Sequence, residues 1–344
     1  MVSIRDIARM ARVSIGTVDR VLHNRGRVSA ATHSRVRKIV EELEYTPNIY
    51  ARNLSMAKPF TFGVLMPKLS QDCGYWRIPA EGIKRAQSEL EPYRVRVRFF
   101  HFDRYSGRSF SVAVQNCLAE NLDGLLVAPA LQQAAEELAS RFQAKIPYAY
   151  FDATIPGSQP LVTIGQDPFL GGVLAANLMR KITGGHGDIA LVKVLPDDFH
   201  IQERVRGFAS VIEPDPAYHL HLVVADSRNP KAMAHEIPER ILDEYPALAG
   251  MFVTNAWTHP FARFIAQQPG KRRVRLIGYD LVPENITCLR SGAIDFLISQ
   301  RPKMQGYWGI LALHRSIVLR QKVRRHIMVP LDILTADNLS YYQD

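Results

Sequence analysis

The sequence predicts an α/β protein: a small three-helix head, followed by two lobes that are each built on a doubly wound parallel sheet. Apolar residues recur at helical spacing three times within residues 1–46, with short breaks between the runs. From residue 61 onward, β-rich runs alternate with longer helical stretches, and the alternation restarts after Pro156-Gly157. A length of 344 residues also favours two or three domains.

Three short helices are expected in the head. The first follows Ser3, whose hydroxyl can cap it, and the second begins after the turn Arg12-Val13 and the cap Ser14. The third runs from about Ala30 to Leu43. Apolar side chains of all three face one small core, and the tight turn between the first two is typical of a helix-turn-helix module.

Basic residues are concentrated in this head. Residues 1–60 contain eleven Lys and Arg against five Asp and Glu, a net charge of +6 out of +10 for the whole chain. This concentration is typical of proteins that bind the phosphate backbone of nucleic acid. A basic surface that only keeps the chain soluble is the alternative. Because the second helix of a helix-turn-helix module lies in the major groove, the pattern favours double-stranded DNA as the partner.

The outer face of the second helix carries the candidates for reading DNA. Arg20 can donate two hydrogen bonds to a guanine, Ile15 can contact a thymine methyl, and Gly16 lets the helix approach the bases closely. For Arg20, a phosphate contact or a surface charge is the alternative. The expected phosphate contacts are polar residues, of which the small ones can equally be helix caps: Ser14, Thr17, His23, Ser29, Thr32 and Asn48.

The head resembles the DNA-binding domain of LacI-type (lactose/galactose repressor) transcription regulators. Four motifs carry the resemblance: Ile4-Arg-Asp-Ile-Ala, Val13-Ser-Ile-Gly-Thr-Val-Asp-Arg-Val21, Val28-Ser29 and Tyr45-Thr-Pro-Asn48. It implies a hinge helix at about 48–55, with Leu54 wedged into a base step of the minor groove and Ala51 allowing two hinge helices to pair. Asp19 departs from the family pattern, which often has a phosphate-contacting serine there, so the operator sequence cannot be transferred from other members.

Each lobe of the body is predicted from four β-rich runs. The first lobe has Thr61–Met66, Arg94–Phe100, Asp123–Ala128 and Tyr148–Asp152, and the second has Asp188–Val194, His219–Ala225, Met251–Thr254 and Val274–Tyr279. Ligands of such sheets bind beyond the carboxyl ends of the strands, where Asp152, Asn255 and Asp280 fall. The expected boundaries are 1–46 for the head, 47–60 for the hinge and linker, 61–165 plus about 301–326 for the first lobe, and 166–300 plus about 327–344 for the second.

The body resembles the sugar-binding core that these regulators share with ribose-type periplasmic solute-binding proteins. Its motifs are Gly165-Gln-Asp167 before Gly171-Gly172, Arg204-x-x-Gly207-Phe208, Phe252-x-x-Asn255, Ile277-Gly-Tyr-Asp280 and Ile298-Ser-Gln300. The resemblance implies that two aromatic residues sandwich a sugar ring and that five polar residues bind its hydroxyls: Tyr75 and Trp76, then Asp152, Arg204, Asn255, Asp280 and Gln300. Carboxylates, amides and guanidinium groups suit polyols, and flat rings suit the apolar face of a sugar.

Some of these residues have simpler interpretations that the sequence leaves open. Asp152 and Asp280 can be helix caps, because acidic residues that follow strands often are. Tyr75 and Trp76 can be packed beneath a loop, and Arg206 can face the cleft in place of Arg204.

The sequence also indicates compartment and assembly. Three scattered cysteines (Cys73, Cys117 and Cys288), no signal peptide and no long apolar run favour a cytoplasmic protein. We expect a homodimer, which pairs two heads on a near-palindromic site. A tetramer is not expected, because the chain ends at Asp344, soon after the β-like run Ile327–Leu334, without a leucine-heptad helix.

The sequence therefore predicts a DNA-binding transcription regulator, a repressor in the simplest case, controlled by a small sugar or polyol. A solute-binding protein for sugar is the alternative, but it has no use for a basic head. A carbohydrate-active or nucleotide enzyme would need catalytic residues, and the metal, nucleophile-elbow and phosphate-loop motifs are missing. We expect no enzyme activity, no cofactor and no metal.

Overall fold

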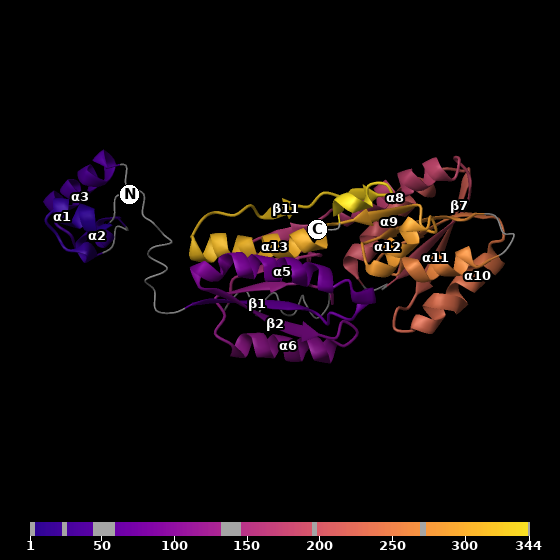
Figure 1. The fold of residues 1–344 in the computed structure, drawn as a ribbon, viewed down its shortest axis with the longest axis horizontal. Coiled ribbons are helices and arrows are strands. Elements are labelled where there is room, and N and C mark those ends of the chain that lie inside the picture. The colour runs from indigo at the N-terminus through magenta and orange to yellow at the C-terminus, as the bar shows by residue number, and fades with distance from the viewer. Residues whose placement is uncertain are drawn as a thin grey trace. The chain divides into compact units, whose positions relative to one another are not determined.

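The structure, a computed structural model, describes residues 4–22, 26–43, 59–131, 146–194, 198–268 and 273–342 of the chain. The chain divides into two compact units, Met1–Lys58 and Pro59–Asp344, each with a core of its own (Figure 1). Several predicted features lie outside the described residues: the cap Ser3, the hinge helix at 48–55, and His23, Asn48, Ala51 and Leu54.

The first unit contains the three predicted helices, α1 (Ile4–Met10), α2 (Ile15–Leu22) and α3 (Ala30–Glu42). The turn between α1 and α2 is as short as expected, and Arg12 enters the left-handed region there, with φ at 52°. The helix-turn-helix prediction is confirmed, and so is its core, in which six apolar side chains are buried: Ile7, Ala8, Ala11, Val18, Val21 and Val36.

The first lobe of the body is a six-stranded parallel sheet with the strand order β11-β5-β4-β3-β1-β2. Its strands are β1 (Phe60–Pro67), β2 (Val95–Phe102), β3 (Gly124–Val127), β4 (Tyr148–Phe151), β5 (Thr163–Gly165) and β11 (His326–Met328). Figure 1 shows α5 (Arg77–Leu90) and α13 (Pro302–Leu313) on one side of the sheet and α6 (Gly107–Ala119) on the other. Covering on both faces explains why β3 and β4 are apolar throughout.

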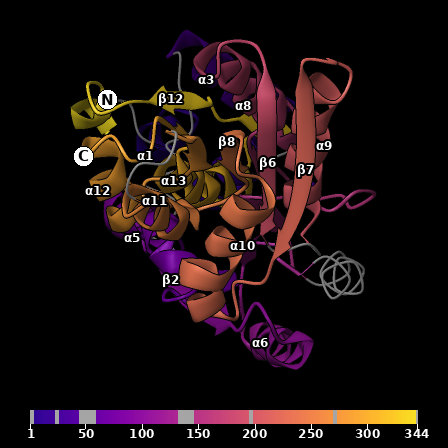
Figure 2. The same cartoon turned by 90° about the vertical axis from the view of Figure 1, so that its right-hand side faces the viewer.

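The second lobe repeats this plan with the strand order β12-β10-β9-β8-β6-β7. Its strands are β6 (Gly187–Val194), β7 (Tyr218–Ala225), β8 (Leu248–Val253), β9 (Arg275–Tyr279), β10 (Phe296–Ser299) and β12 (Asp332–Leu334). All pairs are parallel except β10 with β12. Figure 2 shows β7 at the edge of this sheet beside β6.

Alternate residues of β6 point into two separate cores, as the two-residue period of a strand requires. Ile189 and Leu191 pack in the core beneath α8 (Pro168–Ile182) and α9 (Phe199–Ile212). Ala190, Val192 and Val194 lie in the core on the opposite face, whose helices are α10 (Ile237–Glu244), α11 (Thr258–Ala266) and α12 (Pro283–Arg290). The prediction of two parallel-sheet lobes with helices on both faces is confirmed.

The chain crosses between the lobes three times: from β5 to α8, from β10 to α13, and from β11 to β12. The last crossing corrects the sequence analysis, which treated Ile327–Leu334 as one β-like run belonging to the second lobe. Met328 ends a strand of the first sheet and Asp332 begins a strand of the second. Strands β5 and β10, of three and four residues, were not among the eight predicted runs.

Candidate functional site

The carboxyl ends of strands from both lobes converge on one cleft in the body. All seven residues that the sequence assigned to a ligand lie around it: Tyr75, Trp76, Asp152, Arg204, Asn255, Asp280 and Gln300. The structure adds five that sequence reasoning missed: Asp72, Arg104, His200, Ile201 and Ala256. Together these side chains fill most of the cleft and leave a cavity of about 20 Å³.

Two aspartates occupy equivalent places in the two lobes. Asp152 follows β4, the third strand of the first sheet counted from β11. Asp280 follows β9, the third strand of the second sheet counted from β12. The backbone of both residues is in the left-handed region, with φ of 71° for Asp152 and 65° for Asp280. A non-glycine residue in this region costs on the order of 1–3 kcal/mol, so its surroundings must hold it there.

Neither aspartate is a helix cap. Helix α12 begins at Pro283 after Val282, which makes no side-chain capping bond, and the described segment after Asp152 leads into β5 without a helix. The capping alternative is therefore wrong for both residues, and their carboxylates belong to the cleft.

A chain of hydrogen bonds joins the two aspartates. The Tyr75 hydroxyl donates to Asp152 and accepts from Gln300 Nε2 at 3.1 Å, and the same Nε2 donates to Asp280 Oδ2 at 3.2 Å. Among the described residues, Asp280 Oδ1 has no hydrogen-bond partner. This buried oxygen is a strong acceptor that a hydroxyl donor can satisfy.

Burial raises the pKa of Asp280 to about 7. The nearby charge of Asp152 acts in the same direction, whereas Arg204 and the hydrogen bond from Gln300 favour the ionised form. The carboxyl group therefore changes its charge near neutral pH. A ligand that donates hydrogen bonds to it favours the carboxylate.

Arg204 settles the choice between the two arginines of α9. It is only 1% exposed, and its guanidinium donates to the Thr254 carbonyl at 2.9 Å and to Gln300 Oε1 at 3.0 Å. The same group lies 3.8 Å from the centre of the Tyr279 ring. Arg206, two residues further along the helix, points to solvent and pairs with Glu203 at 2.7 Å.

Tyr75 and Trp76 follow a short 3-10 turn, Asp72–Gly74, that comes after β1. Both rings are buried and both border the cavity. They meet edge to face, at 79° and 5.1 Å between ring centres. Because the two rings are nearly perpendicular, they cannot stack on opposite faces of one sugar ring, and a sugar can stack on the face of only one of them.

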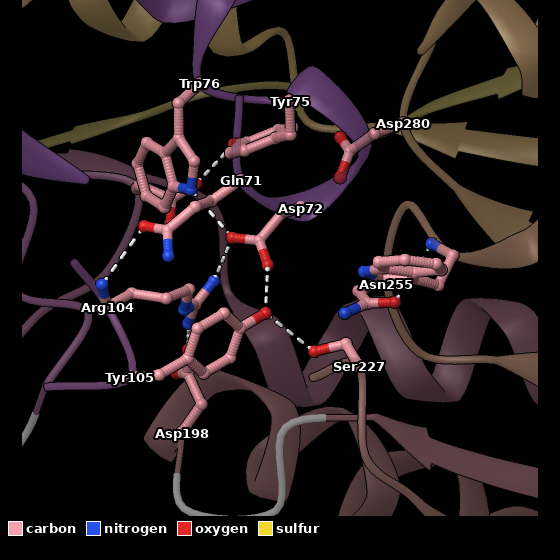
Figure 3. A network of polar contacts seen from close by, with 12 residues as sticks. Gln71, Asp72, Tyr75, Trp76, Arg104, Tyr105, Asp198, Ser227, Asn255 and Asp280 are labelled. Atoms are coloured by element: carbon pink, nitrogen blue, oxygen red, sulfur yellow. Dashed lines mark hydrogen bonds and ion pairs between the residues drawn. The ribbon is translucent and has the colours of Figure 1, made fainter. Parts of the chain in front are cut away.

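A buried ionic network occupies another part of the cleft (Figure 3). Arg104, which follows β2, pairs with Asp72 of its own lobe and donates Nη2 to Asp198 Oδ2 of the second lobe at 2.6 Å. Asp198 Oδ1 lies 2.6 Å from His200 Nδ1. Arg104, like Asp152 and Asp280, is a charged residue just beyond a strand, so the same rule could have selected it from the sequence. Its ion pair with Asp198 of the other lobe could not be predicted from the sequence.

The head presents a second candidate surface on α2. Ile15 is 46% exposed, and Gly16 and Arg20 are exposed on the same helix. The hydroxyl of Ser14 caps α2 by accepting from the backbone N–H of Thr17 at 3.1 Å. Ser29 caps α3 in the same way, accepting from the Thr32 N–H at 3.3 Å.

These four hydroxyl residues are thus located at two helix N-termini. The Ser14 and Thr17 hydroxyls are 2.9 Å apart, and so are those of Ser29 and Thr32. Capping does not exclude phosphate contact, because a helix N-terminus presents free N–H groups and a partial positive charge to an anion. Both interpretations of the four residues are compatible with the geometry.

Two features are absent from the part of the chain that the structure describes. None of its helices has both the length and the apolar character needed to cross a membrane. Nor does it contain a group of three or more His, Cys, Asp or Glu side chains placed to hold a metal ion.

The described residues combine a helix-turn-helix head and a two-lobed body with a polar cleft in one chain. Residues 3–48 match the family model of bacterial regulatory proteins of the lacI family, and residues 62–318 match that of the periplasmic binding protein domain. The chain therefore belongs to the periplasmic binding protein domain family through its body and carries a DNA-binding domain of the lacI family of bacterial regulatory proteins at residues 3–48.

The following relatives are named as transcription regulators. The HTH-type transcriptional regulator DegA of Bacillus subtilis is 28% identical over 217 residues, which cover 61% of this chain and 60% of DegA. The sucrose operon repressor of Klebsiella pneumoniae is 30% identical over 54% of this chain and 53% of its own length. The chain therefore spans only a little more than half the length of these two relatives. A ribose operon repressor of Bacillus subtilis is 24% identical over 83% of both chains.

Solved structures share the fold of the body. A protein assigned as a LacI transcriptional regulator from Bacteroides fragilis is 26% identical, with a TM-score of 0.78 over 83% of this chain and 100% of that one. A solute-binding protein of an ABC transporter from Burkholderia graminis, in complex with D-arabinose, has a TM-score of 0.75 at 18% identity, over 84% of this chain and 100% of its own. At that identity the likeness shows the fold alone.

Proposed function

We propose that this protein is a sequence-specific DNA-binding transcription regulator, acting as a repressor, whose DNA affinity is set by a small sugar-like effector bound between the two lobes. The observation that carries the proposal is the combination in one chain of a helix-turn-helix head and a cleft lined by buried carboxylate, guanidinium and amide groups. The named relatives, which include sucrose and ribose operon repressors, support the same function.

The proposed effector site uses both lobes. Asp280 accepts hydrogen bonds from ligand hydroxyls, and Arg204 and Asn255 donate from the same lobe. Asp152 and one ring of Tyr75 or Trp76 face the ligand from the other lobe, and Gln300 lies between the two aspartates. Ligand pockets commonly measure about 300–1,000 Å³, so a cavity of about 20 Å³ requires the lobes to part before a sugar enters.

The proposed DNA interface uses the exposed side of α2 and the N-termini of α2 and α3. Ile15, Gly16 and Arg20 face base edges, and phosphates are contacted by Ser14, Thr17, Ser29 and Thr32. His23 and Asn48 as phosphate contacts, and Ala51 and Leu54 as hinge residues in the minor groove, belong to the proposal through the family resemblance.

Three further statements complete the proposal. The protein works as a homodimer, because a two-fold arrangement of heads matches a near-palindromic operator. It works in the cytoplasm, where the operator is. It is not an enzyme: its polar cleft residues bind and release a ligand without changing it.

Duplex DNA selected from a random pool by the full-length protein tests the proposal. Fluorescence anisotropy with the selected duplex should show tight binding. The logarithm of the association constant should fall steeply as the logarithm of the KCl concentration rises. At least one compound in a panel of pentoses, hexoses and polyols should then shift the protein concentration at which half of the duplex is bound. The alternative, a solute-binding protein with no DNA role, would bind a sugar by calorimetry and show no preference among duplexes.

A further inference from the structure

A second set of polar contacts joins the lobes without using the seven residues assigned to the effector. Arg104 and Tyr105 follow β2 of the first lobe, Asp198 precedes α9 of the second lobe, and Ser227 follows β7. Arg104 Nη2 lies 2.6 Å from Asp198 Oδ2, and the hydroxyls of Tyr105 and Ser227 are 2.8 Å apart (Figure 3). Both contacts therefore span the cleft from loops at strand ends.

The ionic contact is buried on both sides. The side chain of Arg104 is 6% exposed and that of Asp198 is 5% exposed. Asp72 holds Arg104 from within the first lobe and is itself held by Trp76 Nε1 at 2.7 Å. Parting the lobes would break this ion pair and its charge-assisted hydrogen bond, so the contact favours the arrangement in which the lobes meet.

The charges of the pair are stable over the ordinary pH range. Burial opposes the charge on Arg104, but Asp72 and Asp198 outweigh it and raise the pKa of the guanidinium. Burial likewise opposes the charge on Asp198, but His200 and Arg104 lower the pKa of its carboxyl group. The contact therefore remains ionic at neutral pH.

We propose that Arg104–Asp198 and Tyr105–Ser227 form a latch that holds the two lobes together and sets the equilibrium between the open and closed cleft. Asp198, Tyr105 and Ser227 do not border the cavity, whereas Arg104 does, so substitutions at the first three change the strength of the latch without removing a side chain from the cavity. This inference deepens the proposed function, because a ligand that needs the closed cleft has an apparent affinity proportional to the closed fraction. The latch itself requires no particular effector.

Hydrogen exchange of the full-length protein, with no ligand added, tests the latch. Tyr105→Phe removes one hydroxyl of the latch, and Asp198→Asn removes the charge that faces Arg104. The second substitution does not remove a helix cap, because the Asp198 side chain makes no capping bond to α9. Asp215→Asn is the matched control, since it breaks a 2.8 Å ion pair with Arg180 that lies wholly within the second lobe.

We expect faster exchange on both sides of the cleft. The hydrogen-bonded amides of Tyr75 in the first lobe and of Asn229 in the second should exchange about three- to tenfold faster in Tyr105→Phe. In Asp198→Asn the acceleration should exceed about tenfold. Amides of the central strands β3 and β8 should be unaffected in both variants, and Asp215→Asn should match the unmodified protein at Tyr75 and Asn229.

Three outcomes would overturn the latch: unchanged exchange in Tyr105→Phe and Asp198→Asn, acceleration confined to the lobe that carries the substitution, or acceleration that extends to β3 and β8. The last would indicate a loss of global stability. Because no sugar enters the experiment, the latch can fail while the proposed effector site stands, and the effector site can fail while the latch stands.

Discussion

At the scale of single residues, the cleft depends on polar groups held in positions that cost free energy. Asp152 and Asp280 adopt left-handed backbone conformations, and Asp280 is buried with one carboxylate oxygen unpartnered among the described residues. Arg204 is almost completely buried, and its guanidinium donates hydrogen bonds to the Thr254 carbonyl and to Gln300 Oε1. Costs of this kind are typical of binding sites, because packing alone would favour apolar residues there.

The raised pKa of Asp280 predicts a specific pH dependence of stability. The folded protein holds this proton up to about pH 7, whereas the unfolded chain releases it near the ordinary value of 3.8. Between those values the folded state binds more protons, so the contribution of Asp280 to the free energy of unfolding falls as pH rises and is constant above about pH 7.

Urea unfolding of the unmodified protein and of Asp280→Asn measures this effect. From pH 5 to pH 7 the unmodified protein should lose roughly 2 kcal/mol of stability relative to the variant, because the slope of about 1.4 kcal/mol per pH unit decreases as the pH approaches the folded pKa. Parallel pH profiles for the two proteins would show that the carboxyl group is already ionised at pH 5.

Arg20→Ala should relax base preference at one base pair in each half-site of the operator. If the guanidinium donates two hydrogen bonds to a guanine, discrimination at that position should fall by about 1–3 kcal/mol, with smaller changes elsewhere. Competition with duplexes that carry single base-pair changes measures it. Arg37→Ala, at an exposed position of α3, is the control and should not change the preference. An equal loss on every sequence would make Arg20 a phosphate contact.

At the scale of elements, α8 and α9 pack so closely that only glycine fits where they touch. A Cβ atom on Gly207 would lie 2.0 Å from the Phe169 carbonyl oxygen, and one on Gly172 would lie 2.0 Å from the Arg204 carbonyl oxygen. This approach fixes α9 against its neighbour and so directs Arg204 into the cleft. The glycines of the Gly171-Gly172 and Arg204-x-x-Gly207 motifs therefore serve the site through helix packing.

Gly207→Ala should force the two helices apart. We expect the free energy of unfolding to fall by about 1–3 kcal/mol, the usual cost of overpacking, and effector binding to weaken as Arg204 moves. Gly107→Ala is the control, because a Cβ atom there meets nothing within 4 Å. Thermal unfolding of both variants gives the comparison, and equal melting temperatures would show that α8 and α9 can separate at little cost.

At the scale of the whole molecule, the proposed mechanism requires that ligand and DNA bind to different units of the chain. The cleft belongs to Pro59–Asp344 and the helix-turn-helix to Met1–Lys58. Coupling between them is then a free energy that can be removed without removing either binding reaction. A substitution in the cleft should therefore impair ligand binding and leave DNA binding intact, and a substitution in the helix-turn-helix should do the reverse.

Asp280→Ala should abolish the effect of the sugar on DNA affinity and leave DNA binding without sugar nearly intact. Losing the acceptor leaves the donors of the cleft and ligand unpaired, at about 1–3 kcal/mol for each neutral group and more for a charged one. Calorimetry with the active sugar and anisotropy with the selected duplex measure the two sides. Normal calorimetric affinity in this variant would remove Asp280 from the effector site.

The full-length protein should sediment as a dimer at micromolar concentration without DNA. The reason is that a single helix-turn-helix makes few base contacts, and two-fold pairing doubles them on a near-palindromic site. Sedimentation velocity over a range of concentrations gives the answer. A stable monomer or a tetramer under these conditions would contradict the proposal.

The sequence alone determined the three helices of the head, the face that each of them buries, and most strands of the two sheets. Helical spacing placed α1, α2 and α3 and their six core residues, and β-rich runs placed eight of the strands, because periodicity records which side chains leave water. It also placed seven residues in one cleft through the rule of strand ends and a family resemblance. Each of these conclusions depends on short-range pattern or on motifs that can be read along the chain.

Tertiary structure alone decided what those residues do to one another. The contact of Arg104 with Asp198 joins residues 94 positions apart, and that of Tyr105 with Ser227 spans 122. Only the fold shows that Ile327–Leu334 divides between two sheets, that Arg204 turns inward while Arg206 does not, and that Tyr75 and Trp76 stand perpendicular. The physical reason is that ion pairing, burial and ring geometry depend on distances in space, and distances between remote segments are set by how the sheets and helices pack.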